Sequence, residues 1–529
     1  MIRQVRTLLL SLLVLFVLAG GARAAEHEGY IIRLEPRLSL FALRQELPEG
    51  MEEISGDQNL YRTVDESLIA ELEEAGLLVY AEPDYPVYLL DVEEPVPEEP
   101  GLTEDPASEE SVSEDPVLPD DPALADGRQW NLTAIGMEAV WQRGLTGAGT
   151  DGTPVRIGII DSGLYAEHEE LLDANILQGV NLLAEKGTDE RNDTSDAVGH
   201  GTFIAGIIAA ATDNGLGMAG IAPGAEILPL KSFASSKGSV SDVVEAIYAG
   251  VDAGCQILNM SFGVEEQYAG QALEEAVAYA AEQGVVIVAA VGNNSRGGTD
   301  DDTLLYPAAY EEVIGVGSVD RENEISYFSH RNRSVTLVAP GENLYSLNKT
   351  GPNGYKTGGG TSFSAPEVAA AAALALAVDP DLTAEAFGAL LRASAEDLGE
   401  PGYDTVYGYG LLNLPALLEL LESGDYTLLS AGGDSLVIRA EGLAAGGRMQ
   451  AVRVEYDGSG AQVSLLTLTL TVGEDGTLKG TVALPARTEG RVSLMLVDEN
   501  WRPVTGCWSS AAEETEPPEP PPEATAERD

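Results

Sequence analysis

The sequence predicts an α/β fold whose central domain is built on a mostly parallel sheet. Near-continuous apolar runs, typical of strands that are buried on both faces, recur across residues 128–423. Runs that favour helices lie between them, and this alternation indicates a parallel sheet with helices on both sides. In such sheets, functional side chains gather at the carboxyl ends of the strands. A small α+β module precedes this domain and a small β-rich domain follows it.

Residues 1–24 have the pattern of a secretory signal peptide. Arg3 and Arg6 precede an apolar run at 8–19, and Ala22-Arg23-Ala24 fits a cleavage site. The run is too short to span a bilayer stably, although an uncleaved N-terminal anchor stays an alternative. We therefore expect a secreted, extracellular protein with no membrane span after signal removal, and we leave attachment to the cell surface open.

Residues 25–90 form the predicted α+β module, with strand-like runs at 30–34 and 77–80 around a helical run at 66–75. An acidic, Pro-rich linker follows at 91–127. Up to residue 126 it holds fourteen Asp or Glu, seven Pro and no Lys or Arg. Such a segment cannot bury enough apolar surface to offset its chain entropy, so we expect it to be disordered.

The C-terminal part of the chain changes character. Short β-type runs separated by Gly and Asp turns indicate a β-sandwich-like domain over 425–508. Residues 509–529 are rich in Pro and Glu and are expected to form a disordered acidic tail. The formal net charge of −58 argues against nucleic acid and against anionic membrane surfaces as partners.

The most informative motif is the glycine-rich turn Gly358-Gly359-Gly360, which leads to Ser362 and then to an apolar helical run at 368–378. A serine at a helix N-terminus lies beside unpaired backbone N–H groups and the positive end of the helix dipole. Those groups can stabilise the oxyanion of acyl transfer. Taken alone, the pattern leaves open the alternative of a tight turn with Ser362 as a simple N-cap.

Three further polar residues stand where a site is expected. Asp161 ends the strand predicted at 155–160, Asn293 follows the strand predicted at 285–291, and His200 lies between glycines at the start of an apolar helix. Each of them, taken alone, has a plain explanation as a turn or capping residue. His200 is the best candidate base, because the other histidines lie near the cleavage site or in polar stretches that we expect at the surface: His27, His168 and His330.

Asp, His and Ser divide the work of acyl transfer in a known way. The carboxylate orients the imidazole, the imidazole removes the serine proton, and nearby donors stabilise the oxyanion. The chain order Asp161, His200, Ser362 is the order that subtilisin uses. Seven short motifs in family order make the chain resemble the subtilisin-like serine proteases, or subtilases: Ile160-Asp161-Ser162-Gly163, Gly199-His200-Gly201-Thr202, Leu258-Asn259-Met260-Ser261-Phe262-Gly263, Ala290-Val291-Gly292-Asn293, Tyr306-Pro307-Ala308, Ala339-Pro340-Gly341 and Gly360-Thr361-Ser362-Phe363-Ser364-Ala365-Pro366.

The resemblance implies a subtilisin-like three-layer fold and a serine endopeptidase that cuts protein or peptide substrates through an acyl-enzyme. It assigns Ser362 as nucleophile, His200 as general base and Asp161 as the orienting carboxylate. Asn293 and the Ser362 backbone N–H would form the oxyanion hole. Phe203 and Phe363 depart from the usual histidine and methionine of the family. The substrate-binding edge would comprise Ser261, Phe262, Gly263, Val291 and Gly292.

The resemblance also implies a zymogen. Residues 25–90 resemble the inhibitory propeptide of the family, so this segment would act as an intramolecular inhibitor and be cut off between about Tyr88 and Arg128; an ordinary accessory domain is the alternative. Family members often bind structural Ca²⁺ in a loop like residues 212–218, where Glu170 and Asn214 would be ligands. The family usually has aspartate at the position of Glu170. The chemistry itself needs no cofactor.

Two other functions stay open on the sequence alone. One is a catalytically silent binding protein on the same fold, which the presence of all three triad residue types disfavours. The other is an adhesin whose functional part is the β-rich region 425–508, with the protease only maturing it.

Overall fold

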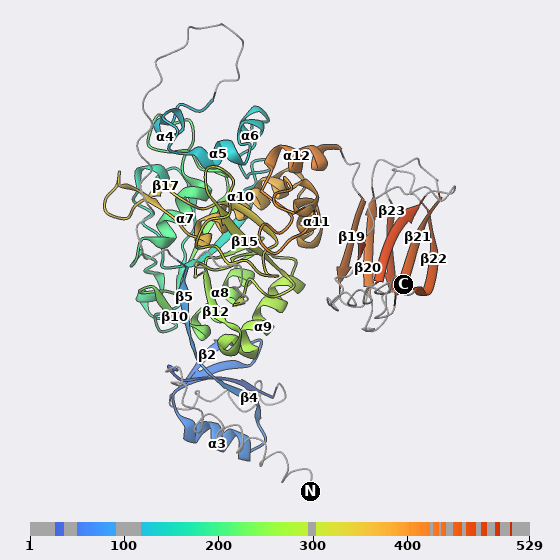
Figure 1. Ribbon diagram of the computed structural model, residues 1–529. Helices are drawn as coiled ribbons and strands as arrows, with labels where there is room; N and C mark the ends of the chain where they lie inside the picture. Colours follow the sequence, from blue (N-terminus) through green and yellow to red (C-terminus); the bar gives the residue numbers. More distant parts are fainter. Residues whose placement is uncertain are drawn as a thin grey trace, which may run out of the picture. The chain divides into compact units, whose positions relative to one another are not determined.

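The computed structural model describes residues 27–35, 50–90, 118–294, 303–400 and 402–423, together with the strands between residues 427 and 509 (Figure 1). The predicted signal peptide, the linker up to residue 117 and the tail from residue 510 lie outside the described residues. The chain divides into two compact units. One comprises residues 1–384 and 394–415, and the other comprises residues 385–393 and 416–529.

The first unit is built on an eight-stranded sheet in which every paired strand is parallel to its neighbour. This confirms the predicted α/β class. Strand β6 lies inside the sheet, so its last residue is flanked by strands on both sides. The strands in sheet order are β16 (Leu337–Pro340), β15 (Val313–Val319), β13 (Val286–Ala290), β11 (Ile257–Met260), β6 (Arg156–Asp161), β9 (Glu226–Lys231) and β7 (Asn175–Ile176), with β8 (Val180–Asn181) also beside β9.

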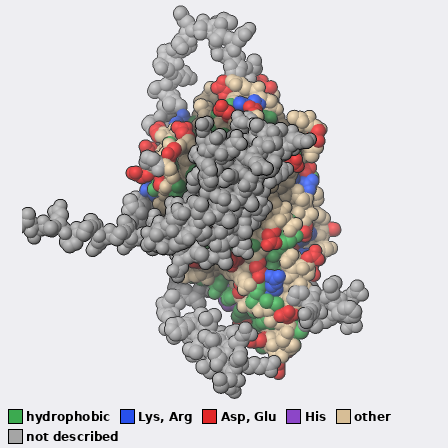
Figure 2. Space-filling view, turned by 90° about the vertical axis from the view of Figure 1, so that its right-hand side faces the viewer, with side chains coloured by type: hydrophobic (Ala, Val, Ile, Leu, Met, Phe, Trp, Pro, Cys, Tyr) green, Lys and Arg blue, Asp and Glu red, His purple; other side chains and the backbone are tan. Residues whose placement is uncertain are grey.

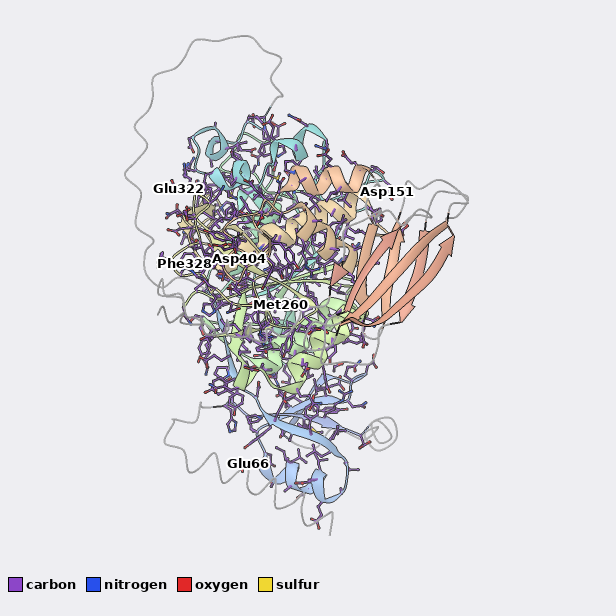
Figure 3. All side chains as sticks on the ribbon, turned by 45° about the vertical axis from the view of Figure 1, so that its right-hand side comes forward. Glu66, Asp151, Met260, Glu322, Phe328 and Asp404 are labelled. Atoms are coloured by element: carbon purple, nitrogen blue, oxygen red, sulfur yellow. The ribbon has the colours of Figure 1, made fainter. Side chains whose placement is uncertain are left out.

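Helices cover this sheet in a three-layer arrangement. Helices α7 (His200–Ala209) and α10 (Thr361–Val378) lie on one side, and α8 (Val240–Asp252) and α9 (Glu266–Glu282) lie on the other (Figure 1). Met260, labelled in Figure 3, is fully buried at the end of β11, inside these layers. Helix α10 is long and apolar enough to cross a membrane by composition, but 94% of it is buried inside the domain. It is a core helix, because a helix that is apolar all round must be enclosed.

Shorter elements complete the domain around these layers. The hairpin of β17 and β18 leads into α10, and α4 lies within the stretch that we predicted to be linker. The linker boundary at residue 127 was therefore wrong, because residues 118–127 are part of the folded domain. The bounds are α4 (Pro122–Ala125), α5 (Trp130–Ala134), α6 (Glu138–Gln142), η1 (Glu169–Leu171), η2 (Asp189–Asn192), β17 (Leu344–Leu347) and β18 (Tyr355–Gly358).

We name the N-terminal module the prosegment for its place ahead of the central domain. Its described residues, 27–35 and 50–90, form an antiparallel sheet with one helix. The helix begins after Asp65, whose carboxylate accepts hydrogen bonds from the N–H groups of Ser67 and Leu68. The strands in sheet order are β2 (Met51–Ser55), β3 (Leu60–Thr63), β1 (Tyr30–Leu34) and β4 (Leu78–Pro83), and the helix is α3 (Glu66–Glu74).

Two prosegment carboxylates fasten the end of β4 to the helical layer. Glu82 accepts hydrogen bonds from the backbone N–H groups of Gln271 and Ala272, where α9 resumes after a non-helical Gly270. Asp84 accepts hydrogen bonds from the backbone N–H and the hydroxyl of Ser241 at the start of α8. Carboxylates at helix N-termini satisfy unpaired N–H groups and interact favourably with the dipole. These contacts fix where the next strand of the prosegment begins.

That next strand, β5 (Pro86–Leu89), is inserted between β10 (Lys237–Ser239) and β12 (Phe262–Glu265), antiparallel to both. Strand β14 (Leu305–Tyr306) completes this second sheet on the far side of β12. The prosegment therefore ends as an added strand on the surface of the central domain.

The second unit contains two antiparallel sheets, as expected for a small β-rich domain. One has the order β19-β20-β23 and the other has the order β22-β21-β24-β25. Helices α11 (Ala384–Ser394) and α12 (Leu414–Ser423) precede these strands in the chain. The strands are β19 (Thr427–Gly432), β20 (Ser435–Ala440), β21 (Arg448–Tyr456), β22 (Gln462–Thr471), β23 (Leu478–Ala483), β24 (Val492–Val497) and β25 (Trp508–Ser509).

The surface is acidic as expected, but two histidines predicted to lie on it do not. Acidic side chains are spread over the part of the surface that Figure 2 describes, as the net charge of −58 leads one to expect. The predicted surface positions of His168 and His330 were wrong, because both residues are fully buried. The imidazole Nε2 of His168 lies 2.7 Å from the carbonyl oxygen of Gly354, a partner that its polar sequence neighbours did not reveal.

Glu367 is a buried acid in the middle of α10. The amide of Asn131 donates a hydrogen bond to its Oε1 at 2.7 Å, but neither Oε2 nor the Asn131 Oδ1 has a hydrogen-bond partner among the described residues. Burial raises the pKa of Glu367 well above its ordinary value. The folded state therefore holds this proton at pH values where the unfolded chain, with a pKa of about 4.3, releases it.

We expect Glu367→Gln to stabilise the protein increasingly as the pH rises. In the wild type, stability from this group is complete below about pH 4 and falls by about 1.4 kcal/mol per pH unit until the folded pKa is reached. Glutamine does not titrate, and its amide can donate to the Asn131 Oδ1. Urea unfolding at about pH 5 and about pH 7 measures the difference. An equal difference at both pH values would mean that Glu367 does not hold a proton.

Candidate active site

The carboxyl end of β6 joins a carboxylate to an imidazole. Asp161 is the last residue of the strand, and His200 is the first residue of α7. The His200 Nδ1 lies 2.9 Å from Asp161 Oδ1 and 2.8 Å from Oδ2, and both side chains are only 1% exposed. A proton on Nδ1 satisfies the carboxylate, so the basic nitrogen of the neutral ring is Nε2.

The carboxylate is held in a dry but polar environment. Burial raises the pKa of Asp161, and the hydrogen bonds from His200 and from the Ser162 backbone N–H oppose that rise. Gly201 lies against this pair, since a Cβ there would be 3.2 Å from the Asp161 side chain and 2.2 Å from the Gly163 carbonyl. Glycine after the histidine therefore lets α7 start close to the carboxylate.

A second carboxylate, which the sequence reasoning missed, organises the start of α7. Asp196 accepts hydrogen bonds from the N–H groups of Val198, Gly199 and Thr202 at 2.7–2.9 Å, and from the hydroxyls of Ser162 and Thr202. Burial acts to raise its pKa, but these donors together hold the pKa of Asp196 below its ordinary value. Its spacing ahead of an apolar helix was the signal for a capping carboxylate.

Ser362 lies in the first turn of α10, not at its cap. The N-cap is Gly360, and the helix runs from Thr361 to Val378. The simple N-cap explanation of Ser362 is therefore excluded. Gly360 has φ 151°, and a Cβ there would lie 3.0 Å from both the Ser362 hydroxyl and the Asn293 amide nitrogen. Glycine is needed because these polar groups converge beside the chain.

Asn293 is oriented by the same helix start. Its Oδ1 accepts hydrogen bonds from the backbone N–H of Thr361 at 2.9 Å and from the Thr361 hydroxyl at 2.8 Å. This fixes the amide so that Nδ2 points the other way, where it donates to the backbone carbonyl of Leu90. Thr361 therefore holds the Asn293 Nδ2 in position, although Thr361 does not itself contact Leu90 in these hydrogen bonds.

The Leu90 carbonyl is the centre of the site. Its oxygen accepts hydrogen bonds from both the Ser362 hydroxyl and the Asn293 amide. The Leu90 N–H donates to the Ser261 carbonyl at 3.2 Å, so the residue continues the pairing of β5. A carbonyl group held between a hydroxyl and an amide donor is the geometry from which acyl transfer starts.

The predicted substrate-binding edge is only partly in contact with this strand. Phe262 pairs with Leu89 and Gly263 with Tyr88. A Cβ on Gly263 would be 3.0 Å from the Leu305 side chain, so glycine lets β14 pack closely against this edge. Val291 and Gly292 lie behind this edge, where their backbone groups bond to Val316, Thr361 and His330.

The two phenylalanines that replace the usual family residues pack on each other beside the site. The ring centroids of Phe203 and Phe363 are 4.1 Å apart, and the His200 ring is 5.4 Å from Phe363. They therefore form one apolar wall next to the imidazole.

The residues predicted to hold calcium are adjacent but bonded to each other. The Asn214 Nδ2 donates to Glu170 Oε2 at 3.0 Å. Within the described residues there is no group of three or more His, Cys, Asp or Glu arranged to hold a metal ion.

Comparisons with known proteins identify the family of this chain. A family model described as the subtilase family, Peptidase_S8, matches residues 152–410. Subtilisin DY of Bacillus licheniformis is 36% identical over 269 residues, which cover 51% of this chain and 92% of that protein. The major intracellular serine protease of Bacillus subtilis (strain 168) is 35% identical over 290 residues, covering 53% of this chain and 88% of that protein.

A solved structure shows the same fold. Fervidolysin from Fervidobacterium pennivorans, described as a keratinolytic enzyme related to subtilisin, has a TM-score of 0.63 and covers 90% of this chain and 72% of its own. At 21% identity this likeness shows the fold alone. The sequence relatives carry the assignment further: this chain belongs to the subtilase family and is a serine-type endopeptidase.

Proposed function

We propose that this chain is an exported serine endopeptidase in which Ser362, His200 and Asp161 act as the catalytic triad and Asn293 stabilises the oxyanion. The observation that carries the proposal is the Leu90 carbonyl, whose oxygen is held by the Ser362 hydroxyl and the Asn293 amide. A peptide carbonyl thus lies within hydrogen-bonding contact of both the proposed nucleophile and the proposed oxyanion donor.

In the reaction, the Ser362 hydroxyl attacks the substrate carbonyl carbon and passes its proton to His200 Nε2. Asp161 keeps the ring in position and stabilises the imidazolium. The negative oxygen is stabilised by the Asn293 amide and by the backbone N–H of Ser362. Ser362 is in the first turn of α10, where a helix leaves its N–H groups without intrahelical acceptors. His200 then gives the proton to the leaving amine, and water releases the acyl group by the same steps in reverse.

The substrate is an extended peptide that adds a strand between β10 and β12, as β5 does. The side chains of β5 and Leu90 indicate which positions are enclosed. Val87 is fully buried and Leu90 is 7% exposed, whereas Tyr88 is 49% exposed. Leu89 is also enclosed, at 6% exposed, so substrates with apolar residues at the last two positions before the cut bond and at the position matching Val87 fit this surface.

The nucleophile is tested with a fluorophosphonate, which reacts with an activated serine in the processed wild-type enzyme. We expect one adduct, on the peptide that contains Ser362, and no peptide hydrolysis afterwards. An adduct on a different serine, or full activity after labelling, would contradict the assignment of Ser362.

We further propose that the first bond cut is Leu90–Asp91 of the same chain, with the prosegment staying bound as an inhibitor. The wild type should yield one fragment that ends at Leu90 and one that begins at Asp91, measured by intact mass. The acyl group on Ser362 is then the prosegment, and the leaving amine is the nitrogen of Asp91.

Two substitutions on the prosegment separate this cut from cleavage elsewhere in the acidic linker. Leu90→Asp places a charge in an enclosed apolar position and should slow processing by about 10²-fold or more. Tyr88→Asp, at a half-exposed position, should be processed at nearly the wild-type rate. Fast processing of Leu90→Asp, or a wild-type fragment that starts elsewhere, would refute the Leu90–Asp91 assignment.

The export proposal rests on the N-terminus of this chain. The Bacillus subtilis relative is intracellular by its name, so similarity to the family does not decide the compartment. Residues 1–24 have the charge, apolar run and cleavage pattern of a secretory signal. Fusion of these residues to a reporter enzyme should export the reporter, and a cytoplasmic reporter would contradict this.

A further inference from the structure

The loop that follows α7, residues 212–218, is the place where the family resemblance led us to expect calcium. Ca²⁺ takes six to eight oxygen ligands from carboxylates, backbone carbonyls, side-chain amides and water. A calcium loop must therefore point oxygen atoms at one centre. The described residues of this loop do not fit that requirement.

The loop directs backbone N–H groups, not carbonyls, at the surrounding carboxylates. Met218 donates to Glu170 Oε1 at 2.9 Å, and Gly215 donates to Asp120 Oδ1 at 2.7 Å. Asp121 accepts from Asp213 at 2.9 Å. Donors around carboxylates stabilise negative charge and offer nothing to a cation.

The side chain of Asn214 also directs its NH₂ group, not its oxygen, at the Glu170 carboxylate. Its Nδ2 bonds to Glu170 Oε2 at 3.0 Å, while its Oδ1 accepts the Leu216 N–H at 2.8 Å. A flipped amide would place NH₂ against the Leu216 N–H, so the hydrogen bonds fix the orientation. The oxygen that calcium would need is already engaged within the loop.

Tyr355 fills the space beside the carboxylate. Its hydroxyl donates to Glu170 Oε1 at 2.8 Å, and its ring lies against Gly217, where a Cβ would be 2.0 Å from the ring. A tyrosine hydroxyl is protonated at neutral pH, so it is the donor in this hydrogen bond. The ring stacks on Tyr345, over which the Arg128 guanidinium lies at 4.3 Å.

We propose that Glu170 closes this loop in place of a metal ion. Its carboxylate is fully buried and accepts three hydrogen bonds, from Met218, Asn214 and Tyr355. The one extra methylene of glutamate, compared with the aspartate usual in the family, carries the carboxylate toward the loop. This chain is therefore a subtilase whose loop 212–218 is stable without calcium.

The test measures thermal unfolding of the full chain in the Ser362→Ala background, which removes self-digestion. A site that binds Ca²⁺ only in the folded state raises the unfolding midpoint with the logarithm of free Ca²⁺. We expect the same midpoint in calcium chloride and in EDTA. We expect Glu170→Gln to lower it by roughly 4–8 °C in both conditions, because all three donors lose a charged acceptor. Tyr355→Phe should lower it by less, again in both.

Controls separate this loop from calcium bound elsewhere on an acidic surface. Glu167→Gln removes the same charge from an exposed position nearby and should leave the midpoint unchanged. A calcium response that is identical in wild type, Glu170→Gln and Tyr355→Phe arises elsewhere and supports the proposal. A calcium response that Glu170→Gln or Tyr355→Phe abolishes would overturn it, as would a one-to-one calcium isotherm that either change removes.

Discussion

Replacement of Ser362 by alanine is expected to reduce turnover of a peptide substrate by about 10⁶-fold and to leave the chain uncut at Leu90–Asp91. The magnitude is that known for the same change in subtilisin itself. The physical reason is that the attacking oxygen is lost while the groups around it stay in place. Asn293 keeps its bonds to Thr361, and Leu90 keeps its bond to Ser261.

The measurement is kcat with a short peptide, together with intact mass of the purified chain. KM should change little, because strand pairing with β12 does not involve the hydroxyl. The uncut prosegment would block the site. The activity of the Ser362→Ala variant is therefore also measured after added wild-type enzyme has cut off its prosegment and has been removed. Loss of kcat only in the uncut form would assign the defect to blockage.

Ser364→Ala is the matched control on the same helix. Ser364 is fully buried, and its hydroxyl has no hydrogen-bond partner among the described residues. Its removal should preserve both processing and turnover. If Ser364→Ala were as inactive as Ser362→Ala, the effect would belong to the packing of α10 and not to a nucleophile.

The central sheet and the places of Asp161, His200 and Ser362 at its edge could be predicted from the sequence because each signal is local. Buried parallel strands have continuous apolar runs. Asp161 is the last residue of β6, and Asn293 follows the end of β13 by three residues. His200 and Ser362 stand in glycine-bounded helix starts, although α10 begins seven residues before its apolar run suggested. Proximity in space then followed from the rule that strand ends meet at one edge.

What could not be predicted depends on partners far away in the chain. The buried state of His168 depends on Gly354, and the role of Glu170 depends on Tyr355. A polar stretch of sequence does not reveal whether residues from a distant part of the chain will bury it. The position of Leu90 likewise depends on the register of β5 on β12. Two prosegment carboxylates, bonded to backbone N–H groups of α8 and α9, hold the chain just before β5. Only the folded chain brings the Leu90 carbonyl beside Ser362.

Asp161→Asn is expected to reduce kcat by about 3 × 10⁴-fold, the magnitude that removal of this carboxylate has in subtilisin. The carboxylate contacts His200 Nδ1 through both oxygens, at 2.9 and 2.8 Å, and so keeps the proton on that nitrogen. An asparagine can present its NH₂ group instead, which favours the tautomer with the proton on Nε2 and removes the base. It also leaves the imidazolium without a counter-charge in a site that is 1% exposed.

The pH dependence separates this role from a structural one. Because the base is disabled by its tautomer and not by loss of the ring, hydroxide can partly replace it, and activity of Asp161→Asn should keep rising at alkaline pH where the wild type has levelled off. Asp193→Asn is the control, because Asp193 is exposed and its carboxylate accepts a hydrogen bond from the nearby Ser195 N–H, away from the His200 ring. If Asp161→Asn lost activity without that alkaline rise and with a lower unfolding midpoint, the carboxylate would be holding the fold and not the imidazole.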